Sequence, residues 1–273
     1  MIARPAQLVV NALLVVMAAF ALFPLLWMLA ASFMTPGESA AYPPPLLPGD
    51  PTLANYRELF ARAGIGRYLA NSVLLAVSVT VCSLVMNVMA GYAFAKLRFA
   101  GRERLFRLML GALVIPGQVA LVPLFLLLKH LGLVNTYGGI VVPALASIFG
   151  IFLVRQYALS IPDDLLEAAR MDGASEWRIF GSIVVPLLRP IIVTLAVFTL
   201  LGTWNDFMWP LIVLTDRDLQ TLPVALASLA REHVQDNELM MAGSVLTIAP
   251  ALIVFLVLQR HYIQGLMLGS VKG

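Results

Sequence analysis

The dominant pattern along the chain is a series of long apolar stretches separated by shorter polar ones. Six stretches each approach or exceed the roughly 20 residues that an α-helix needs to cross a bilayer. They cover residues 8–32, 68–95, 108–128, 131–154, 191–215 and 239–259, and only the fifth contains a charged residue, Asp206. The pattern predicts an all-α integral membrane protein with six transmembrane helices, organised as a single transmembrane domain over residues 1–273.

Two of these stretches leave a choice open. The first ends in Ala30-Ala31-Ser32, small residues of the kind that precede signal-peptide cleavage. The apolar part of a signal peptide is usually about 7 to 15 residues long, so the length of this stretch favours a retained helix. The fourth stretch contains Gly138, Gly139 and Pro143, which leave its ends uncertain by several residues.

Composition agrees with a membrane protein and excludes several other classes. Hydrophobic residues make up 60% of the chain and charged residues 12%, about half the share usual in soluble domains. The single Cys82 excludes an intrachain disulfide and a cysteine metal cluster. The three histidines are spread over loop and tail positions, so no metal site is expected, and a net charge of +3 gives no reason to expect nucleic acid.

The distribution of basic residues predicts the orientation, because cytoplasmic loops retain Lys and Arg. With the N-terminus inside, twelve of the 18 basic residues fall in inner segments. The densest cluster lies between the second and third stretches. We therefore expect both termini in the cytoplasm, the segment 155–189 inside, and the segments 33–67 and 216–238 outside. Within the last segment, residues 222–230 are expected to form a short helix at the membrane interface.

The cytoplasmic segment 155–189 is the longest inner connection, and long ordered connections are usually functional. Its sequence predicts two short helices at an angle within residues 163–182. Asp163 or Asp164 can cap the first helix, with Glu167 placed as in a capping box.

The remaining local signals delimit both helices. Asp172-Gly173 is expected to end the first helix, since glycine adopts the left-handed conformation common at that position. Ser175 can cap the second helix, which Pro186 and Pro190 then reshape. The first helix also carries Leu165, Leu166, Ala169 and Met171, a partly apolar face that suits a groove on another protein.

The same residues resemble a known signature. Glu167-Ala168-Ala169, three residues, Gly173, and then Phe180, Pro186 and Pro190 are similar to the signature loop of binding-protein-dependent ABC importer permeases, about a hundred residues before the C-terminus. The resemblance implies a type I ABC importer permease fold, in which this loop couples to an ATPase subunit. The residues that it assigns to coupling are Glu167, Ala168, Ala169, Asp172, Gly173, Ala174, Phe180 and Pro186. The alternative is an ordinary capped helical hairpin at the membrane interface.

Two further segments resemble carbohydrate-uptake permeases. Residues 203–207, Thr-Trp-Asn-Asp-Phe, are similar to their Trp-Asn segment, and residues 259–273 resemble the tail of the second, maltose-type permease of a pair. The resemblance makes Trp204, Asn205 and Asp206 a candidate solute path and Gly269, Lys272 and Gly273 a candidate ATPase-contacting tail. Asp206 can instead make a structural contact near the outer end of its helix, and Trp204 and Trp209 can be interfacial anchors.

The resemblance also implies partners and a location. They are a homologous second permease that forms a heterodimer, two cytoplasmic ABC ATPase subunits and an extracytoplasmic solute-binding protein, in the cytoplasmic (inner) membrane of a bacterium or archaeon. The chain has no Gly-x-x-x-x-Gly-Lys-Ser/Thr phosphate loop. We therefore expect a transport subunit without catalytic residues or a cofactor of its own, with ATP and Mg bound by the partner ATPases. The transported solute is expected to be a sugar or sugar-like compound.

Other classes fit the residues less well. A secondary transporter usually has internal repeats and broken helices with polar groups near the midplane, and the sequence has no evident repeat. A membrane enzyme would need an acid–base or metal constellation, which the pattern does not contain. A permease for a non-sugar solute such as glycerol phosphate remains open.

Overall fold

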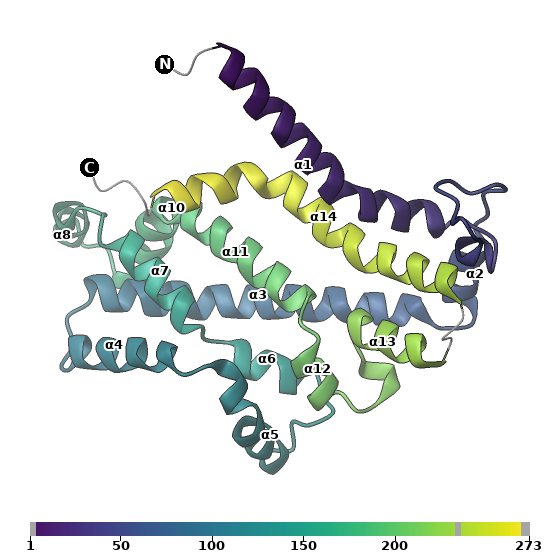
Figure 1. Cartoon of the computed structure of the whole chain (residues 1–273). Coiled ribbons are helices and arrows are strands. Elements are labelled where there is room, and N and C mark those ends of the chain that lie inside the picture. Colours follow the sequence, from purple (N-terminus) through teal and green to yellow (C-terminus); the bar gives the residue numbers. More distant parts are fainter. Residues whose placement is uncertain (1–3, 233–235, 269–273) are drawn as a thin grey trace. The chain divides into compact units, whose positions relative to one another are not determined.

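The computed structural model of the protein describes residues 4–232 and 236–268 (Figure 1), and this part of the chain forms helices, turns and loops without a strand. Contacts divide the chain into two units, Met1–Arg67 with Leu222–Pro250, and Tyr68–Thr221 with Ala251–Gly273. In the described residues, four helices are long and apolar enough to cross a membrane, and two bent pairs would bring the number to six. The prediction of an all-α membrane protein is confirmed.

The first unit contains the first apolar stretch and the start of the last one. Its elements are α1 (Arg4–Ala31), η1 (Glu38–Ala40), α2 (Ala54–Ala61), α13 (Leu222–Glu232) and the beginning of α14 (Asn237–Leu268). Both apolar stretches form continuous helices as expected, and the short helix predicted for residues 222–230 is α13. Its expected position at the membrane interface stays a prediction.

Two carboxylates hold the proline-rich loop between α1 and α2. Glu38 accepts hydrogen bonds from the backbone N–H groups of Gly49 (2.6 Å) and Thr35 (2.9 Å). These N–H groups, that of Gly49 first, lower the pKa of the Glu38 carboxyl below its ordinary value. Glu238, in the first turn of α14, is buried and accepts a hydrogen bond of 2.7 Å from the Ser39 N–H. Glu38 therefore closes the loop on itself, and Glu238 attaches the loop to α14.

The second unit contains the other elements. They are α3 (Ile65–Lys96, from Tyr68 onward), α4 (Arg102–Gly111), η2 (Ala112–Val114), η3 (Gly117–Ala120), α5 (Leu121–His130), α6 (Gly138–Ala144), α7 (Ile148–Ala158), α8 (Asp163–Met171), α9 (Glu176–Ile179), the π-helical turn η4 (Phe180–Val184), α10 (Val185–Leu187), α11 (Arg189–Trp204), α12 (Met208–Val213), η5 (Arg217–Leu219) and the end of α14. The second apolar stretch is the single helix α3, as predicted.

The other three apolar stretches are interrupted. The third is bent by 95° between Arg102–Val114 and Gly117–His130, where Pro116 lacks the N–H group that a continuous helix needs. The fourth begins only at Gly138, and α6 and α7 are separated at Ser147, whose side chain accepts a hydrogen bond from the Gly150 N–H as the N-cap of α7.

The fifth stretch ends as a helix at Trp204 and resumes in α12. The Asn205 amide donates to the Leu201 carbonyl at 2.9 Å, a local bond of the kind that competes with helical geometry. Asp206 therefore lies beyond the end of α11, and not within a continuous helix as expected.

The core of the second unit forms where α3 packs against α7, α11 and the segment between them (Figure 1). Val88 and Tyr92 of α3 meet Val154 of α7 and Leu195 of α11 in this core. A Cβ atom on Gly91 would lie 2.6 Å from the Cβ of Val154, so α3 and α7 approach each other too closely for any larger residue. This packing places the C-terminal end of α3 next to the segment with the sequence signature.

Candidate functional site

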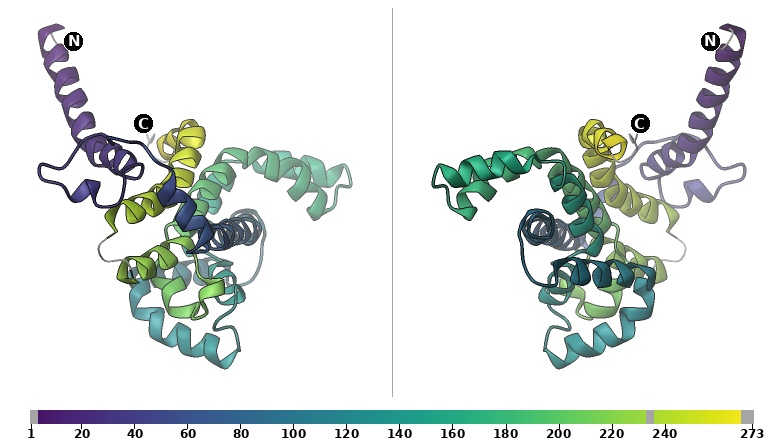
Figure 2. Two further views of the ribbon diagram at one scale, coloured as in Figure 1. Left: turned by 90° about the vertical axis from the view of Figure 1, so that its right-hand side faces the viewer. Right: turned by 90° about the vertical axis from the view of Figure 1, so that its left-hand side faces the viewer.

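The segment that joins α7 to α11, residues 159–188, forms the helices predicted for the signature loop and is called the α8–α10 segment below. Figure 2 shows it projecting sideways from the rest of its unit. The helix α8 begins at Asp163 with Pro162 as N-cap, and no side chain caps it. The prediction that Asp163 or Asp164 caps this helix was wrong, because both residues already lie in its first turn.

The end of α8 and the start of α9 follow the sequence signals. Gly173 has a φ of 81°, the left-handed conformation expected at the end of a helix. The Ala174 N–H donates to the Ala169 carbonyl at 3.0 Å and closes the turn. Ser175 caps α9 through its hydroxyl, which accepts a hydrogen bond of 3.4 Å from the Arg178 N–H. Both predictions are confirmed.

The prolines shape the second half of the segment. Pro186 lacks an N–H group and cannot continue the regular hydrogen-bond ladder. The chain widens into the π-helical turn η4, which ends two residues before Pro186. Pro190 lies in the first turn of α11, where a missing N–H group has no cost. The segment therefore ends in a bend of 76° between Glu176–Leu187 and Arg189–Trp204.

The apolar face predicted for α8 is divided between the interior and the surface. Leu166 is 1% exposed and belongs to the core of its own unit, and Ala169 packs against that core. In contrast, Leu165 is 43% and Met171 89% exposed. Trp177 of α9, which the sequence analysis did not single out, is 73% exposed. The accessible large apolar side chains of the segment are therefore Leu159, Leu165, Met171, Trp177 and Leu187, of which Met171 and Trp177 are the most exposed.

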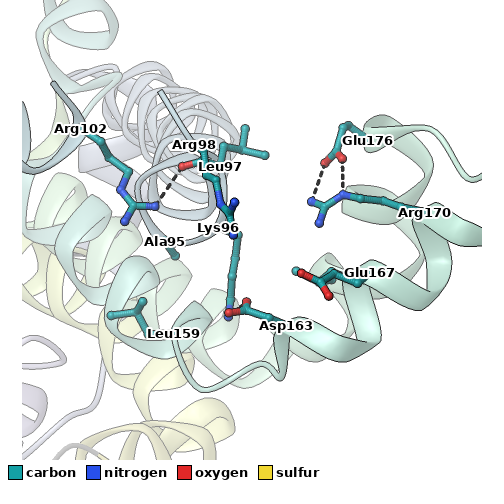
Figure 3. Close-up of a pocket in the computed structure, with 11 residues that line it drawn as sticks. Ala95, Lys96, Leu97, Arg98, Arg102, Leu159, Asp163, Glu167, Arg170 and Glu176 are labelled. Carbon is teal, nitrogen blue, oxygen red and sulfur yellow. Dashed lines mark hydrogen bonds and ion pairs between the residues drawn. The ribbon is translucent and has the colours of Figure 1, made fainter. Parts of the chain in front are cut away.

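A cavity of about 860 Å³ lies between α8, the C-terminal end of α3 and the start of α4 (Figure 3). It is lined by basic and acidic side chains in similar number. The charged lining residues are Lys96, Arg98, Arg102, Asp163, Glu167, Arg170 and Glu176. A cavity with this lining favours a polar or charged group of a partner over an apolar one.

Two ion pairs order the lining of this cavity. The Lys96 Nζ lies 2.7 Å from Asp163 Oδ1, and this hydrogen bond lowers the pKa of the Asp163 carboxyl. Arg170 Nε lies 2.7 Å from Glu176 Oε1, and the hydrogen bond from Arg170 lowers the pKa of the Glu176 carboxyl. Both carboxylates stay ionised at neutral pH.

The residues that the resemblance assigns to coupling do not all face the same way. Glu167 lines the cavity, and its carboxylate has no hydrogen-bond partner in the part of the chain that the structure describes. Ala168, Asp172 and Pro186 are exposed and Ala174 is partly buried. The Phe180 ring packs 5.4 Å from the ring of Tyr92. Glu167, Ala168, Asp172, Gly173 and Pro186 are thus accessible, whereas Phe180 supports the segment from within.

The three residues of the candidate solute path also lie in different environments. Trp204 is buried, and the Asn205 amide is bonded to the helix that precedes it. Asp206 lines a cavity of about 230 Å³ together with Thr203, Trp209 and apolar residues of α3, α5 and α6. Trp209 is 9% exposed, and its indole N–H donates to the Gly139 carbonyl at 3.1 Å. Trp204 and Trp209 are therefore both core residues, and their interpretation as interfacial anchors was wrong.

The remaining candidates have no site in the described structure. Gly269, Lys272 and Gly273 of the predicted ATPase-contacting tail lie outside the described residues. Within the described ranges, no group of three or more His, Cys, Asp or Glu side chains is placed to hold a metal ion.

Comparisons with known proteins give extensive matches. A family model for the binding-protein-dependent transport system inner membrane component matches residues 87–267. The arabinooligosaccharides transport system permease protein AraQ of Halalkalibacterium halodurans is 40% identical, over 93% of this chain and 92% of that protein. The sn-glycerol-3-phosphate transport system permease protein UgpE of Escherichia coli is 32% identical, over 94% of each chain.

A solved structure shares the fold. It is a chain of a bacterial ABC transporter involved in the import of the acidic polysaccharide alginate, with a TM-score of 0.85 and 25% identity. The match covers 96% of this chain and 99% of that one. The range matched by the family model includes the whole α8–α10 segment and the residues around Asp206.

Proposed function

Because the chain belongs to the family of binding-protein-dependent transport system inner membrane components, we propose that it is a permease subunit of an ATP-driven importer for a sugar or sugar-like solute. The 40% identity to an arabinooligosaccharide permease over almost the full length supports a carbohydrate solute. The type I ABC importer permease fold, which the alginate transporter chain shares, supports ATP as the energy source.

The α8–α10 segment is the surface on which a cytoplasmic ATPase subunit binds. The observation that carries this proposal is the exposure of Met171 and Trp177, 89% and 73%, on a short charged segment whose Leu166 and Ile179 already pack in the core of the unit. Large apolar side chains at the centre of a polar surface are typical of a protein interface. Glu167, in the cavity beside them, is then available for a polar contact with the same partner.

The assembly follows from the family. We propose a heterodimer with a homologous permease, two ATPase subunits that bind ATP and Mg, and an extracytoplasmic solute-binding protein. The chain lies in the cytoplasmic membrane with six spans and both termini inside, each bent pair of helices counting as one span. The excess of basic residues in the inner segments supports this orientation.

A direct test is uptake by the reconstituted transporter. The permease, its partner subunits and the binding protein from the same gene cluster are placed in proteoliposomes, and radiolabelled arabinooligosaccharides and glycerol 3-phosphate are supplied in parallel. ATP-dependent uptake of the sugar supports the proposal. Uptake of glycerol 3-phosphate alone would establish the alternative substrate class, and uptake driven by an ion gradient without ATP would establish a secondary transporter.

A charge reversal ties the uptake to the proposed interface. Glu167→Lys should abolish ATP-dependent uptake while the permease inserts normally, because it replaces the accessible carboxylate with a cation. Glu58→Lys is the matched control, since the Glu58 side chain is 40% exposed and among the described residues pairs with Arg62 at the end of α2, in the loop expected outside. Equal uptake by the two variants would contradict the role of Glu167.

A second candidate site concerns the solute. Asp206 is the one acidic residue in the six apolar stretches, and together with Thr203 it supplies polar groups to an otherwise apolar cavity. Charged residues at membrane depth are functional candidates by default. We propose that Asp206 contacts hydroxyl groups of the passing solute, with Trp204 and Asn205 positioning it. Asp206→Asn should then raise the solute concentration needed for half-maximal uptake without changing assembly.

A further inference from the structure

The α8–α10 segment is bonded to α3 at the point where that helix ends. Lys96, the last residue of α3, donates to the Ile161 carbonyl at 2.5 Å and to Asp163 Oδ1 at 2.7 Å. The Lys96 side chain is only 5% exposed, whereas Asp163 is 74% exposed. A buried ammonium group is costly without partners, so Lys96 has a strong preference for keeping these bonds. The entrance to α8 is thereby held on α3.

One turn earlier, Tyr92 holds the second helix of the segment. Tyr92 is 4% exposed, and its hydroxyl lies 3.4 Å from Glu176 Oε2 at the start of α9. Its ring packs on Phe180 of η4 at 5.4 Å. Because Arg170 of α8 makes two hydrogen bonds to Glu176, at 2.7 and 3.3 Å, the two helices are also joined to each other. Both halves of the segment are therefore attached to the same helix.

The same helix carries polar contacts along the rest of its length. Asn87 is fully buried, and its Oδ1 accepts a hydrogen bond of 2.9 Å from the Ser147 N–H at the break between α6 and α7. Asn71 donates to the Asp218 and Gln220 carbonyls, each at 2.9 Å, in the connection that follows α12. From Lys96 to Asn71 a helix rises about 37 Å, which exceeds the thickness of the hydrocarbon core.

We infer that Lys96 and Tyr92 are positioning residues that make α3 move as one body with the α8–α10 segment, so that α3 carries displacement of the ATPase-binding surface across the membrane. The inference rests on the proposed function, since it assigns the route by which that surface acts on the rest of the subunit. Rigid helices and hydrogen-bond networks are physical carriers of such coupling. Covalent connection alone would favour α7 and α11 as carriers, but the charged and polar bonds of the segment go to α3.

The inference is tested by a distance measured in the complete transporter. Spin labels are attached at Asp164→Cys on α8, which is exposed and not among the residues proposed to contact the ATPase, and at the exposed Val85→Cys on α3, in a Cys82→Ser background. Double electron–electron resonance is recorded without nucleotide and after trapping with ATP and vanadate. We expect the same α3–α8 distance in both states in the otherwise unmutated assembly, and a distance that differs between the states in Lys96→Met.

Lys96→Met is chosen because methionine fills a similar volume without leaving a buried donor unpaired. A distance that changes between the two states in the unmutated assembly would overturn the inference, since α3 and α8 would then move separately. A constant α3–α8 distance in Lys96→Met would also overturn it, because Lys96 would then not be needed to keep α3 and α8 together.

A coupling measurement separates positioning from simple stability. The ratio of solute-stimulated to basal ATP hydrolysis should fall several-fold in Lys96→Met and recover in part in Lys96→Arg, while the ATPase subunits stay bound on purification. Arg104→Gln is the control, because Arg104 is an exposed cation in the same basic cluster with no hydrogen bond or ion pair among the described residues. An unchanged ratio in Lys96→Met would overturn the inference, and so would an equal fall in Arg104→Gln.

A different result would contradict the proposed function itself. An unmutated assembly that does not hydrolyse ATP in response to solute would remove the functional proposal itself. The α3–α8 distance tests the mechanical connection in an assembly that has already passed that check.

Discussion

Replacing Gly173 separates the backbone requirement of the turn between α8 and α9 from its side-chain contacts. Gly173 has a φ of 81°, and a Cβ built on it would have no atom within 4 Å. The cost of Gly173→Val therefore comes from the backbone and not from a clash. A β-branched residue held in this conformation costs about 1–3 kcal/mol, which corresponds to a shift of roughly 5- to 150-fold in the population of the native turn.

Asparagine provides the matched comparison at this position, because it is tolerated in the left-handed region far better than valine. Gly173→Asn should keep the turn, although it also adds a side chain to an exposed site. The nine residues of α8 are too few to hold a helix without tertiary contacts, so loss of the turn in the valine variant should disorder the whole of the proposed ATPase-binding surface.

The assay is retention of the ATPase subunits by the tagged permease, followed by solute-stimulated ATP hydrolysis. We expect Gly173→Val to lose bound ATPase or its stimulation, and Gly173→Asn to remain close to the unmutated protein. Similar insertion of both variants in the membrane is the control. Equal behaviour of valine and asparagine would refute the backbone argument, and normal coupling in both would remove the turn from the interface.

Three further predictions concern stability, topology and pH. Gly91→Ala should lower the free energy of unfolding by about 1–3 kcal/mol, seen as a lower Tm, because its Cβ would lie 2.6 Å from side-chain atoms of α7; an unchanged Tm would contradict this packing. In a Cys82→Ser background, an impermeant thiol reagent should label Tyr42→Cys in intact cells and not Ser175→Cys, and the reverse result would invert the topology. The bond from the lysine at the end of α3 lowers the pKa of Asp163, so its stabilisation is complete at neutral pH and lost as pH falls below about 3.9. Hydrogen exchange of α8 should accelerate in that acid range, and Asp163→Asn should remove this pH dependence; an unaltered profile in that variant would refute it.

The continuous helices could be predicted from the sequence, whereas the breaks depended on local and tertiary chemistry. Unbroken apolar composition indicates both ends of α1 and α3 and the start of α14 within four residues, whereas α14 continues nine residues beyond the predicted end at 259. Composition alone does not reveal the break after Trp204, because it depends on the Asn205 side chain bonding to a preceding carbonyl. Pro116 indicates the 95° bend in the third stretch, but a prediction based only on the length of the apolar stretch does not take this proline into account.

In the candidate site, too, local features could be predicted from the sequence and tertiary contacts could not. The signals for the turn at Gly173 and the cap at Ser175 are local, and both were predicted correctly. The attachment to α3 was not predicted, because Lys96 and Asp163 are 67 residues apart in the sequence. A basic residue at the end of a span is evidence for the orientation of the chain in the membrane. The exposure of Trp177 likewise depends on which face of α9 the core covers, which only the fold decides.

The central claim, that the α8–α10 segment is the binding surface for the ATPase, is tested most directly by site-specific photo-crosslinking in the assembled transporter. A photoreactive amino acid replaces Met171, which is 89% exposed on α8, and in a parallel sample it replaces Tyr42, which is 99% exposed in the loop expected outside. We predict that irradiation joins the ATPase subunit to the permease from position 171 and not from position 42. Transport-competent assemblies in which position 171 yields no ATPase adduct, or in which position 42 yields it equally, would contradict the claim.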